Sequence, residues 1–234
     1  MRSFRVILSL AAAVMAVCTA PANATFVLGT GNVGNLGDNV IVNNCVGNTL
    51  GPATTVSGCL NTSHTTLVDV STTNAAGLTA NGGQARFDHA GVTLLDNFTI
   101  NFADPSLGFS GIVFNINGAG QTQSSLTFTV IAVDQFGNAE AAQIFNGSLD
   151  GAGQNFFNLT SADGEVATSV KVVSSLINIE DIRQVRIAQE DVPECPTGQT
   201  CGGGGPGIPE PASLFLLGSA LLGYGAARRR RQRS

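Results

Sequence analysis

Residues 97–102 have the sequence NFTINF, in which polar and apolar side chains alternate without exception. Successive side chains of an extended strand point to opposite faces, so Phe98, Ile100 and Phe102 share one face. The three residues between them are polar, which is typical of a strand with one face in a core and the other in water. The stretch therefore predicts a half-buried β-strand.

The same alternation recurs at short intervals toward the C-terminus, in 111–116, 126–130, 166–172 and 185–187. Pairs of turn-forming residues separate these runs. The pairs are Asp104-Pro105, Asn117-Gly118, Gly137-Asn138, Asp150-Gly151 and Asp163-Gly164. No stretch of about eleven residues has the periodicity of an amphipathic helix. We therefore expect residues 25–192 to form one all-β domain, an antiparallel β-sandwich that is jelly-roll-like, with polar outer faces.

The first 24 residues have the pattern of an export signal. Two arginines precede an apolar run at 6–17, and Ala22 and Ala24 frame a cleavage site of the small-x-small type. The pattern predicts a signal helix over 1–24 that is removed after Ala24, so that the mature chain begins at Thr25. The alternative is an uncleaved N-terminal anchor, for which the apolar run is short.

The C-terminus has three parts in a fixed order. Pro209, Glu210 and Pro211 come first, and an uncharged segment follows at 212–227. A helix of that length is about 24 Å long, against a hydrocarbon core near 30 Å. We expect a single transmembrane helix there, with a stop-transfer cluster of arginines kept in the cytoplasm. The cluster is formed by Arg228, Arg229, Arg230, Arg231 and Arg233.

Together these three parts, residues 209–234, closely resemble the PEP-CTERM sorting signal of Gram-negative bacteria. The resemblance implies that an exosortase, a membrane-embedded enzyme, recognises Pro209, Glu210 and Pro211 and processes the chain near them. It also implies transient attachment to the inner membrane, a final location at the cell surface or outside the cell, and association with the exopolysaccharide of a biofilm matrix. A permanent single-pass anchor is the other interpretation, but such an anchor has no need of a Pro-Glu-Pro sequence.

Four cysteines remain after removal of the leader, and an even number in an exported chain predicts two disulfides. Three pairings are possible. We favour Cys45–Cys59 and Cys195–Cys201, because each pair closes a short loop. Neither a Cys-x2-Cys spacing nor a nearby pair of histidines supports a zinc site, so no metal is predicted from them. The second pair lies in a flexible Gly/Pro linker at 193–208 that includes four consecutive glycines.

The charge of the chain is unevenly distributed. Seven of the 11 basic residues lie in the two terminal segments, so residues 25–208 carry 15 acidic against 4 basic side chains, a net charge of −11. Such a body repels phosphate backbones, which excludes nucleic acid as a partner. It attracts cations, and Asp134, Asn138 and Asp150 offer oxygen ligands in turns, so bound Ca2+ stays an open alternative to a protein without cofactors.

The sequence favours a non-enzymatic surface or matrix protein. No Gly-x-Ser-x-Gly elbow is present, and the histidines, His64 and His89, are not placed as partners of a nucleophile. We expect His64 to lie in an exposed loop. Two other functions stay open. One is a Ca2+- or carbohydrate-binding module, and the other is a glycan hydrolase that uses a pair of carboxylates. The candidate acids for the hydrolase are Glu140, Glu165, Glu180 and Asp181.

Overall fold

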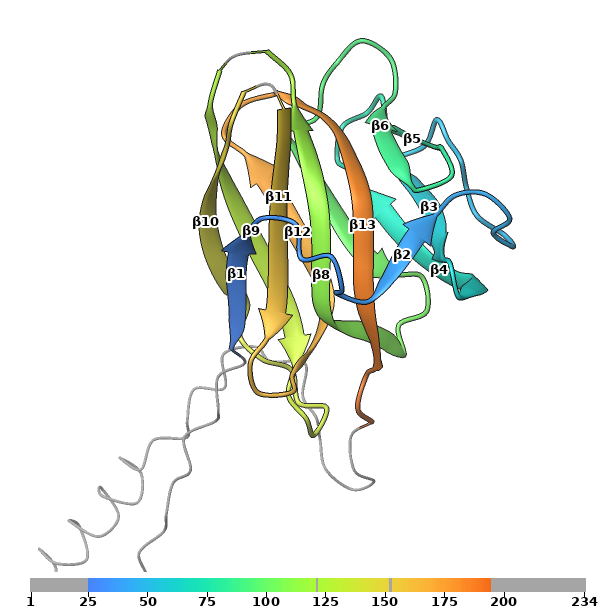
Figure 1. Cartoon of the computed structure of the whole chain (residues 1–234), viewed down its shortest axis with the longest axis vertical. Helices are drawn as coiled ribbons and strands as arrows, with labels where there is room; N and C mark the ends of the chain where they lie inside the picture. Colours follow the sequence, from blue (N-terminus) through green and yellow to red (C-terminus); the bar gives the residue numbers. More distant parts are fainter. Residues whose placement is uncertain (1–24, 121, 152, 195–234) are drawn as a thin grey trace, which may run out of the picture.

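The fold is all-β and antiparallel (Figure 1). The structure is a computed structural model, which describes residues 25–120, 122–151 and 153–194. These residues form thirteen strands and no helix, which confirms the prediction that this domain is all-β. In chain order the strands are β1 (Phe26–Thr30), β2 (Asp38–Ile41), β3 (Thr55–Leu60), β4 (Ser63–Ser71), β5 (Leu78–Asn81), β6 (Arg86–His89), β7 (Asn97–Phe102), β8 (Leu107–Gly118), β9 (Ser124–Val133), β10 (Gln143–Leu149), β11 (Gly153–Ser161), β12 (Val166–Ser174) and β13 (Ile179–Asp191).

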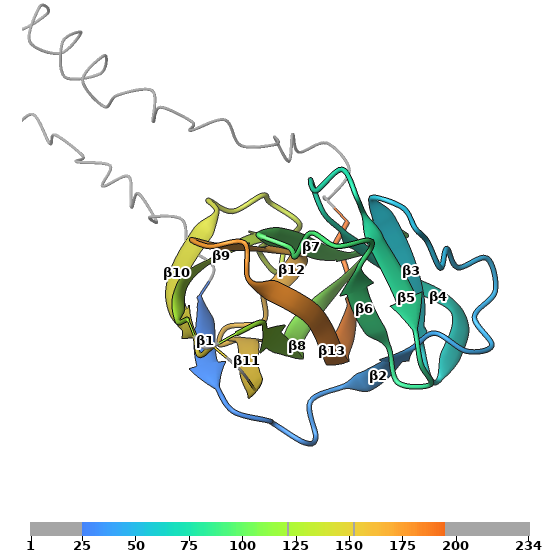
Figure 2. The ribbon, with the colours of Figure 1, turned by 90° about the horizontal axis from the view of Figure 1, so that it is seen from above.

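The strands do not form the two separate sheets that a sandwich would have. Hydrogen bonds connect β8, β13, β2, β3, β4, β7 and β12 in this order, and β12 returns to β8 through the pair Ala167 and Phe109. The ring is a closed antiparallel barrel with extra strands on its edges: β11 and β1 beside β8, β9 and β10 beside β12, and β6 and β5 beside β13. Figure 2 views this arrangement end-on, with β1, β10 and β11 on one side and β3 to β6 on the other.

Closure of the barrel depends on strands that change partners along their length. The pairing of β13 with β6 ends at Arg183, and its pairing with β2 begins at Arg186. Between them the register shifts, and Gln184 has a φ of 51°. An extra residue in one strand bends that strand and increases its twist, so this bulge turns β13 from one neighbour to the next.

Strand β8 differs from the expected half-buried strand, because both of its faces are buried. Ile112, Phe114 and Ile116 lie in the core as predicted, but Val113 and Asn115 on the opposite face are also buried. The segment 31–37, between β1 and β2, crosses in front of β11 and β8 (Figure 1). Its Leu36 side chain would lie 3.0 Å from a Cβ built on Gly111 of β8, so this glycine allows the close approach.

Phenylalanine rings from four strands meet in the centre of the core. The ring of Phe114 lies 5.8 Å from that of Phe98, edge to face, and 6.4 Å from that of Phe157. Phe128 and Phe157 are 5.0 Å apart. Aromatic pairs at such separations add to the stability that burial alone provides. The residues of NFTINF form β7 with the predicted bounds, and its Phe98 joins this cluster.

Four of the five predicted turn pairs lie between strands, and one does not. Asn117 and Gly118 belong to the end of β8, where Asn117 pairs with Gln154 on one side and Asp181 on the other. The prediction of a turn there is wrong, because hydrogen bonds on both edges extend the strand through these residues. Gly164, in the turn between β11 and β12, has a φ of 83°, a conformation that glycine adopts without strain.

The predicted signal helix, linker and sorting helix lie outside the described residues, except for positions 193 and 194 of the linker. Within the part of the chain that the structure describes, no helix is long and apolar enough to cross a membrane.

Candidate functional site

The two segments predicted to direct export join the domain at the same end. Strand β1 begins and β13 ends at the lower end of the domain in Figure 1. At that end the N–H of Val192 donates to the carbonyl of Ser106, 2.8 Å away, and the N–H of Ala162 donates to the carbonyl of Thr25, 2.9 Å away. The opposite end of the barrel is therefore far from the places where the described domain begins and ends.

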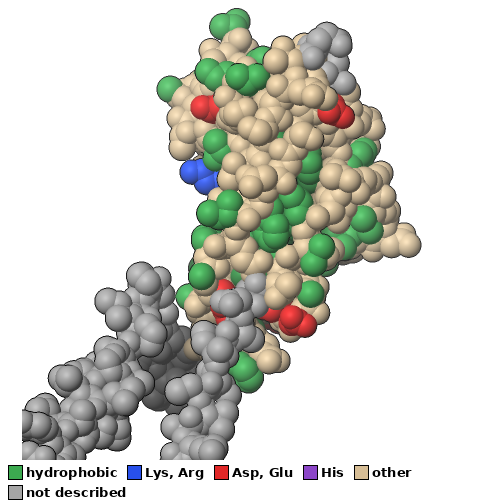
Figure 3. Space-filling view, turned by 90° about the vertical axis from the view of Figure 1, so that its left-hand side faces the viewer, with side chains coloured by type: hydrophobic (Ala, Val, Ile, Leu, Met, Phe, Trp, Pro, Cys, Tyr) green, Lys and Arg blue, Asp and Glu red, His purple; other side chains and the backbone are tan. Residues whose placement is uncertain are grey.

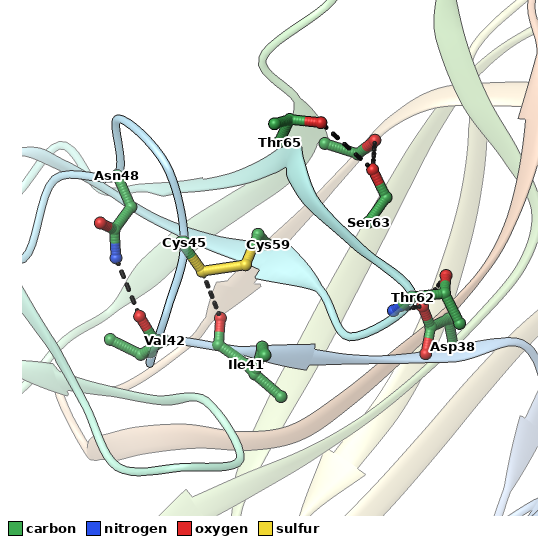
Figure 4. The surroundings of a disulfide bond; sticks show 10 residues. Asp38, Ile41, Val42, Cys45, Asn48, Cys59, Thr62, Ser63 and Thr65 are labelled. Atoms are coloured by element: carbon green, nitrogen blue, oxygen red, sulfur yellow. Dashed lines mark hydrogen bonds between the residues drawn. A yellow bond between two sulfur atoms is a disulfide. The ribbon is translucent and has the colours of Figure 1, made fainter.

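The predicted disulfide between Cys45 and Cys59 is confirmed (Figure 4). Cys59 is a buried residue of β3, whereas Cys45 lies in the loop that follows β2, and their Cα atoms are 5.5 Å apart. Asn48 Nδ2 donates to the carbonyl of Val42 over 3.0 Å, which closes the same loop. The bond thus ties an Asn- and Gly-rich segment, otherwise poor in apolar contacts, to the core. The pair Cys195–Cys201 lies outside the described residues and stays a prediction.

An open depression of about 410 Å³ lies beside this loop. Asn39 and Gln84 meet there, where Gln84 Nε2 donates to Asn39 Oδ1 over 3.2 Å. An amide offers both donors and acceptors, as the hydroxyl groups of a sugar do. These amides carry no sequence motif, and the only signal for them in the sequence is the Asn-rich composition of residues 25–60. The lining residues are Asn39, Ile41, Asn43, Asn44, Asn61, Gly83 and Gln84.

Of the carboxylates proposed for a hydrolase, Asp181 is engaged in ion pairs. It has no exposed surface, and it binds Arg86 of β6 over 2.8 Å and also Arg183 of its own strand. The charge of Asp181 raises the pKa of Arg183 further above its ordinary range, chiefly through their hydrogen bond. Glu180, its neighbour, accepts a hydrogen bond of 2.8 Å from Asn117 Nδ2. Asp181 therefore holds strands together and does not face a cleft.

The carboxylate of Glu165 is also engaged in hydrogen bonds within the fold. Glu165 is 5% exposed, and its carboxylate accepts hydrogen bonds from Ser161 at the end of β11 and from the N–H of Thr25, just before β1. Glu140 lies just before β10, where its N–H donates to the carbonyl of Ala132 over 3.0 Å. The structure brings neither of them to the side chain of Asp181 by any hydrogen bond among the described residues.

In the turn proposed to bind Ca2+, the carboxylate of Asp134 accepts hydrogen bonds from the turn itself. Asp134 Oδ1 accepts the N–H groups of Phe136 and Asn138, each over 2.8 Å, and its Oδ2 accepts Asn138 Nδ2 over 2.8 Å. Burial raises the pKa of Asp134, but these hydrogen bonds outweigh it, so the pKa lies below its ordinary value. Within the described ranges, no group of three His, Cys, Asp or Glu residues could hold a metal ion.

The histidines lie on strands. His64, expected in an exposed loop, is an exposed residue near the start of β4, and its carbonyl accepts the N–H of Val46 over 2.8 Å. The expected loop is a strand because residues 55–60 and 63–71 pair as a hairpin. His89 ends β6, but Asp88 binds Arg86 and Asn81 and so does not orient the imidazole.

One side of the domain carries the edge strands β1 and β10. In Figure 3 this side shows a band of hydrophobic side chains between polar ones. Leu28 of β1 and Phe145 of β10 pack partly buried against the core, while Val27 and Ile144 are 53% and 65% exposed. Charged side chains lie above, below and beside this band in the same view.

Comparison with known proteins identifies the C-terminal segment. Residues 207–231 match the family described as the PEP-CTERM protein-sorting motif, so the chain carries this motif at the predicted place. No curated protein matches the sequence. One solved structure, the enzymatically active domain of tailspike protein 4 of bacteriophage CBA120, is similar over 72% of this chain and 20% of its own, with 19% identity and a TM-score of 0.25. A likeness at this TM-score carries no argument about fold or activity.

Proposed function

We propose that this protein is exported across the inner membrane of a Gram-negative bacterium and is sorted by an exosortase to the cell surface or the extracellular matrix. The observation that carries the proposal is the sorting motif at 207–231. In this proposal the leader 1–24 is removed after Ala24, and segment 212–227 holds the chain in the membrane until processing near Pro209, Glu210 and Pro211.

The described domain supports a role outside the cytoplasm. The bond between Cys45 and Cys59 is of the kind that persists in oxidising compartments. Because both chain ends leave the barrel at one end, the opposite end and the sides can face away from the membrane while the sorting segment is anchored (Figure 1). We propose that this exposed body acts without catalysis, as a component of an exopolysaccharide matrix.

The proposal is tested by changing Pro209, Glu210 and Pro211 together to alanine in the full chain, in a bacterium that encodes an exosortase. We expect a longer species that stays in the membrane fraction, seen by electrophoresis and fractionation. The matched control changes Gly202, Gly203 and Gly204 to alanine in the same linker, which leaves the motif intact. Deletion of the exosortase gene should give the same retained species as the motif variant.

A permanent membrane anchor makes the opposite prediction. If segment 212–227 only anchors the protein, the motif variant and the original chain have the same mobility and the same membrane retention. Unchanged release of the motif variant would also contradict sorting through Pro209, Glu210 and Pro211. A full-length chain that keeps residues 1–24 in the cytosol would contradict the export route as a whole.

The depression lined by amides favours a second candidate function, binding of a neutral polysaccharide. Five amide side chains surround an open space of about 410 Å³ and can hydrogen-bond to hydroxyl groups. A glycan array, probed with and without Ca2+, tests this function. We expect the change of Asn61 and Gln84 to alanine to remove the signal and the change of the exposed Asn146 on β10 to leave it. Equal signals from both variants would contradict binding at this depression.

A further inference from the structure

Thr25, the first residue of the mature chain according to the cleavage site after Ala24, is held at both of its backbone polar groups. Its nitrogen donates to Glu165 Oε1 over 3.1 Å. Its carbonyl accepts the N–H of Ala162 over 2.9 Å. Both partners belong to the end of β11 and the turn that leads to β12, so the point at which the leader is removed is fixed against one turn of the barrel.

The carboxylate that receives Thr25 is buried among neutral donors. Glu165 is 5% exposed, and its Oε2 accepts Ser161 Oγ over 2.7 Å and the N–H of Asp163 over 3.2 Å. Burial raises the pKa of Glu165, but the hydrogen bonds from Ser161 and from the backbones of Glu165, Thr25 and Asp163 outweigh it and lower the pKa. The group is therefore ionised at neutral pH.

A buried charge is costly unless an opposite charge or strong hydrogen bonds compensate for it. Among residues 25–120, 122–151 and 153–194, Glu165 forms no ion pair with a Lys or Arg side chain. Arg86 and Arg183 bind Asp181, and Arg186 Nη1 donates to the carbonyl of Val33 over 3.0 Å. The turn thus presents an anion to Thr25 without a side-chain cation to match it.

Removal of the leader changes the nitrogen of Thr25 from an amide into an amine. Water hydrolyses the peptide bond: its oxygen becomes part of the carboxylate of Ala24, and the nitrogen of Thr25 gains a hydrogen. An α-amino group has an ordinary pKa of about 7.7–8.0, so it takes up a further proton at neutral pH and carries a positive charge. The amide of Thr25 already donates a hydrogen bond to the ionised carboxylate of Glu165, and the ammonium group adds the attraction of an opposite charge to it.

We propose that Glu165 is the binding site for the α-ammonium group that leader removal creates at Thr25, so that processing itself completes the fold. The inference rests on the cleavage after Ala24 that belongs to the proposed export route. Strand β1 is an edge strand that pairs with β11, and the N–H of Phe26 donates to Gln143 Oε1 on β10 over 3.0 Å. The ion pair strengthens the attachment of this strand in the mature chain, and the precursor lacks it.

The experiment compares two full chains exported in a host without an exosortase and purified in mild detergent. One has the natural sequence, and its first residue is checked by Edman degradation. The other has Gly-Ser inserted between Ala24 and Thr25, so that cleavage after Ala24 leaves a neutral amide at Thr25. The change Glu165→Gln is made in each chain, and the equilibrium constant for folding is measured in urea.

We expect Glu165→Gln to lower the equilibrium constant about tenfold more in the chain that begins at Thr25 than in the extended chain, because only there does the substitution remove an ion pair. The control Ser161→Ala removes a neutral donor to the same carboxylate and should cost the same in both chains. Equal losses from Glu165→Gln in the two chains overturn the inference and leave the export route intact. A processed chain that begins at a residue other than Thr25 also overturns the inference. A chain that keeps residues 1–24 contradicts the export route as well.

A second measurement needs no substitution at Glu165. The pKa of the α-amino group, followed by NMR of protein labelled with ¹⁵N-threonine for the natural chain and with ¹⁵N-glycine for the chain with the insertion, should be about one unit higher in the natural chain, which corresponds to the tenfold coupling. Equal pKa values in the two chains overturn the inference, even if the Glu165→Gln variant does not fold.

Discussion

The guanidinium group of Arg86, on β6, lies 2.8 Å from the carboxylate of Asp181, on β13, which has no exposed surface. Arg183 binds the same carboxylate, and Arg86 also binds Asp88 over 2.8 Å. In a domain with few basic residues, two of them thus converge on one acid. The contact lies where β6 pairs with β13, next to the bulge at which β13 changes partner.

The change Asp181→Asn should destabilise the domain by about 2–3 kcal/mol, because it leaves two arginines without their shared counter-charge. The arginine side chains are 39% and 33% exposed, so water partly compensates and the loss stays below that of a fully buried pair. Urea unfolding measures the free energy. The exposed Asp163→Asn serves as a control and should stay within about 0.5 kcal/mol of the original chain. Equal effects of the two changes would show that the ion pairs do not hold β6 to β13.

Replacement of both Cys45 and Cys59 by alanine should cost about 3 kcal/mol, because their bond closes a loop with a sequence separation of 14 and restricts the unfolded chain. Denaturant unfolding of the oxidised proteins measures the loss. The double alanine variant of Cys195 and Cys201 is the matched comparison, since the same number of thiols is removed. Alkylation of Cys45 or Cys59 in the folded protein without reductant would contradict the bond.

The lowered pKa of Glu165 predicts a specific loss of stability in acid. A carboxyl group with a folded pKa below its unfolded value, about 4.3, stabilises the fold fully above that value. The contribution disappears as the pH falls through the lower folded pKa. Between about pH 6 and about pH 3 the original chain should therefore lose more unfolding free energy than Glu165→Gln. The exposed Glu190→Gln should lose as much as the original chain. If Glu165→Gln loses as much as Glu190→Gln, the lowered pKa is wrong.

The sequence was sufficient to predict those elements whose signals lie in residues close together in the chain. The alternation in NFTINF defines β7, because each side chain is either in the core or in water. Cys45 and Cys59 could be paired because the loop between them is short. The disulfide and the sorting motif were predicted from residues close together in the chain, and both predictions are confirmed.

The remaining features depend on contacts between distant residues. Asn117 and Gly118 are typical turn residues, yet β8 continues through them because it has a partner on each edge. The closure of the barrel depends on one pair of strand residues, Ala167 and Phe109, which the alternation of polar and apolar side chains does not predict. Thr25 and Glu165 are 140 residues apart, so their contact could not be read from either segment alone.

Ca2+ should leave the midpoint of thermal unfolding unchanged, because both carboxylate oxygens of Asp134 already accept hydrogen bonds within their turn. Unfolding is followed by circular dichroism with Ca2+ and with a chelator. The change Asp134→Ala should lower the stability by about 1 kcal/mol, since it removes the acceptor for the N–H groups of Phe136 and Asn138. A rise in the unfolding midpoint with Ca2+ that Asp134→Ala abolishes would show instead that the turn binds the ion.

Asn115, on the face of β8 opposite the core, provides the prediction with the least obvious sign. It is 1% exposed, and neither its Nδ2 nor its Oδ1 has a hydrogen-bond partner among the described residues. Leucine has the same number of side-chain heavy atoms and no polar group to leave unpaired. The change Asn115→Leu should therefore stabilise the domain by about 1–2 kcal/mol, measured by urea unfolding.

The matched control for this change is Asn97→Leu. Asn97 is 8% exposed, but its amide is satisfied: Nδ2 donates to Thr73 Oγ1 over 2.8 Å, and Oδ1 accepts the N–H of Thr73 over 3.1 Å. Its replacement should destabilise the domain by about 2 kcal/mol, because the N–H and the hydroxyl of Thr73 lose their partners. The two changes thus have opposite expected signs for the same substitution, because only the amide of Asn97 has partners. A loss at Asn115 as large as that at Asn97 would mean that the amide of Asn115 binds a water molecule or a ligand in solution.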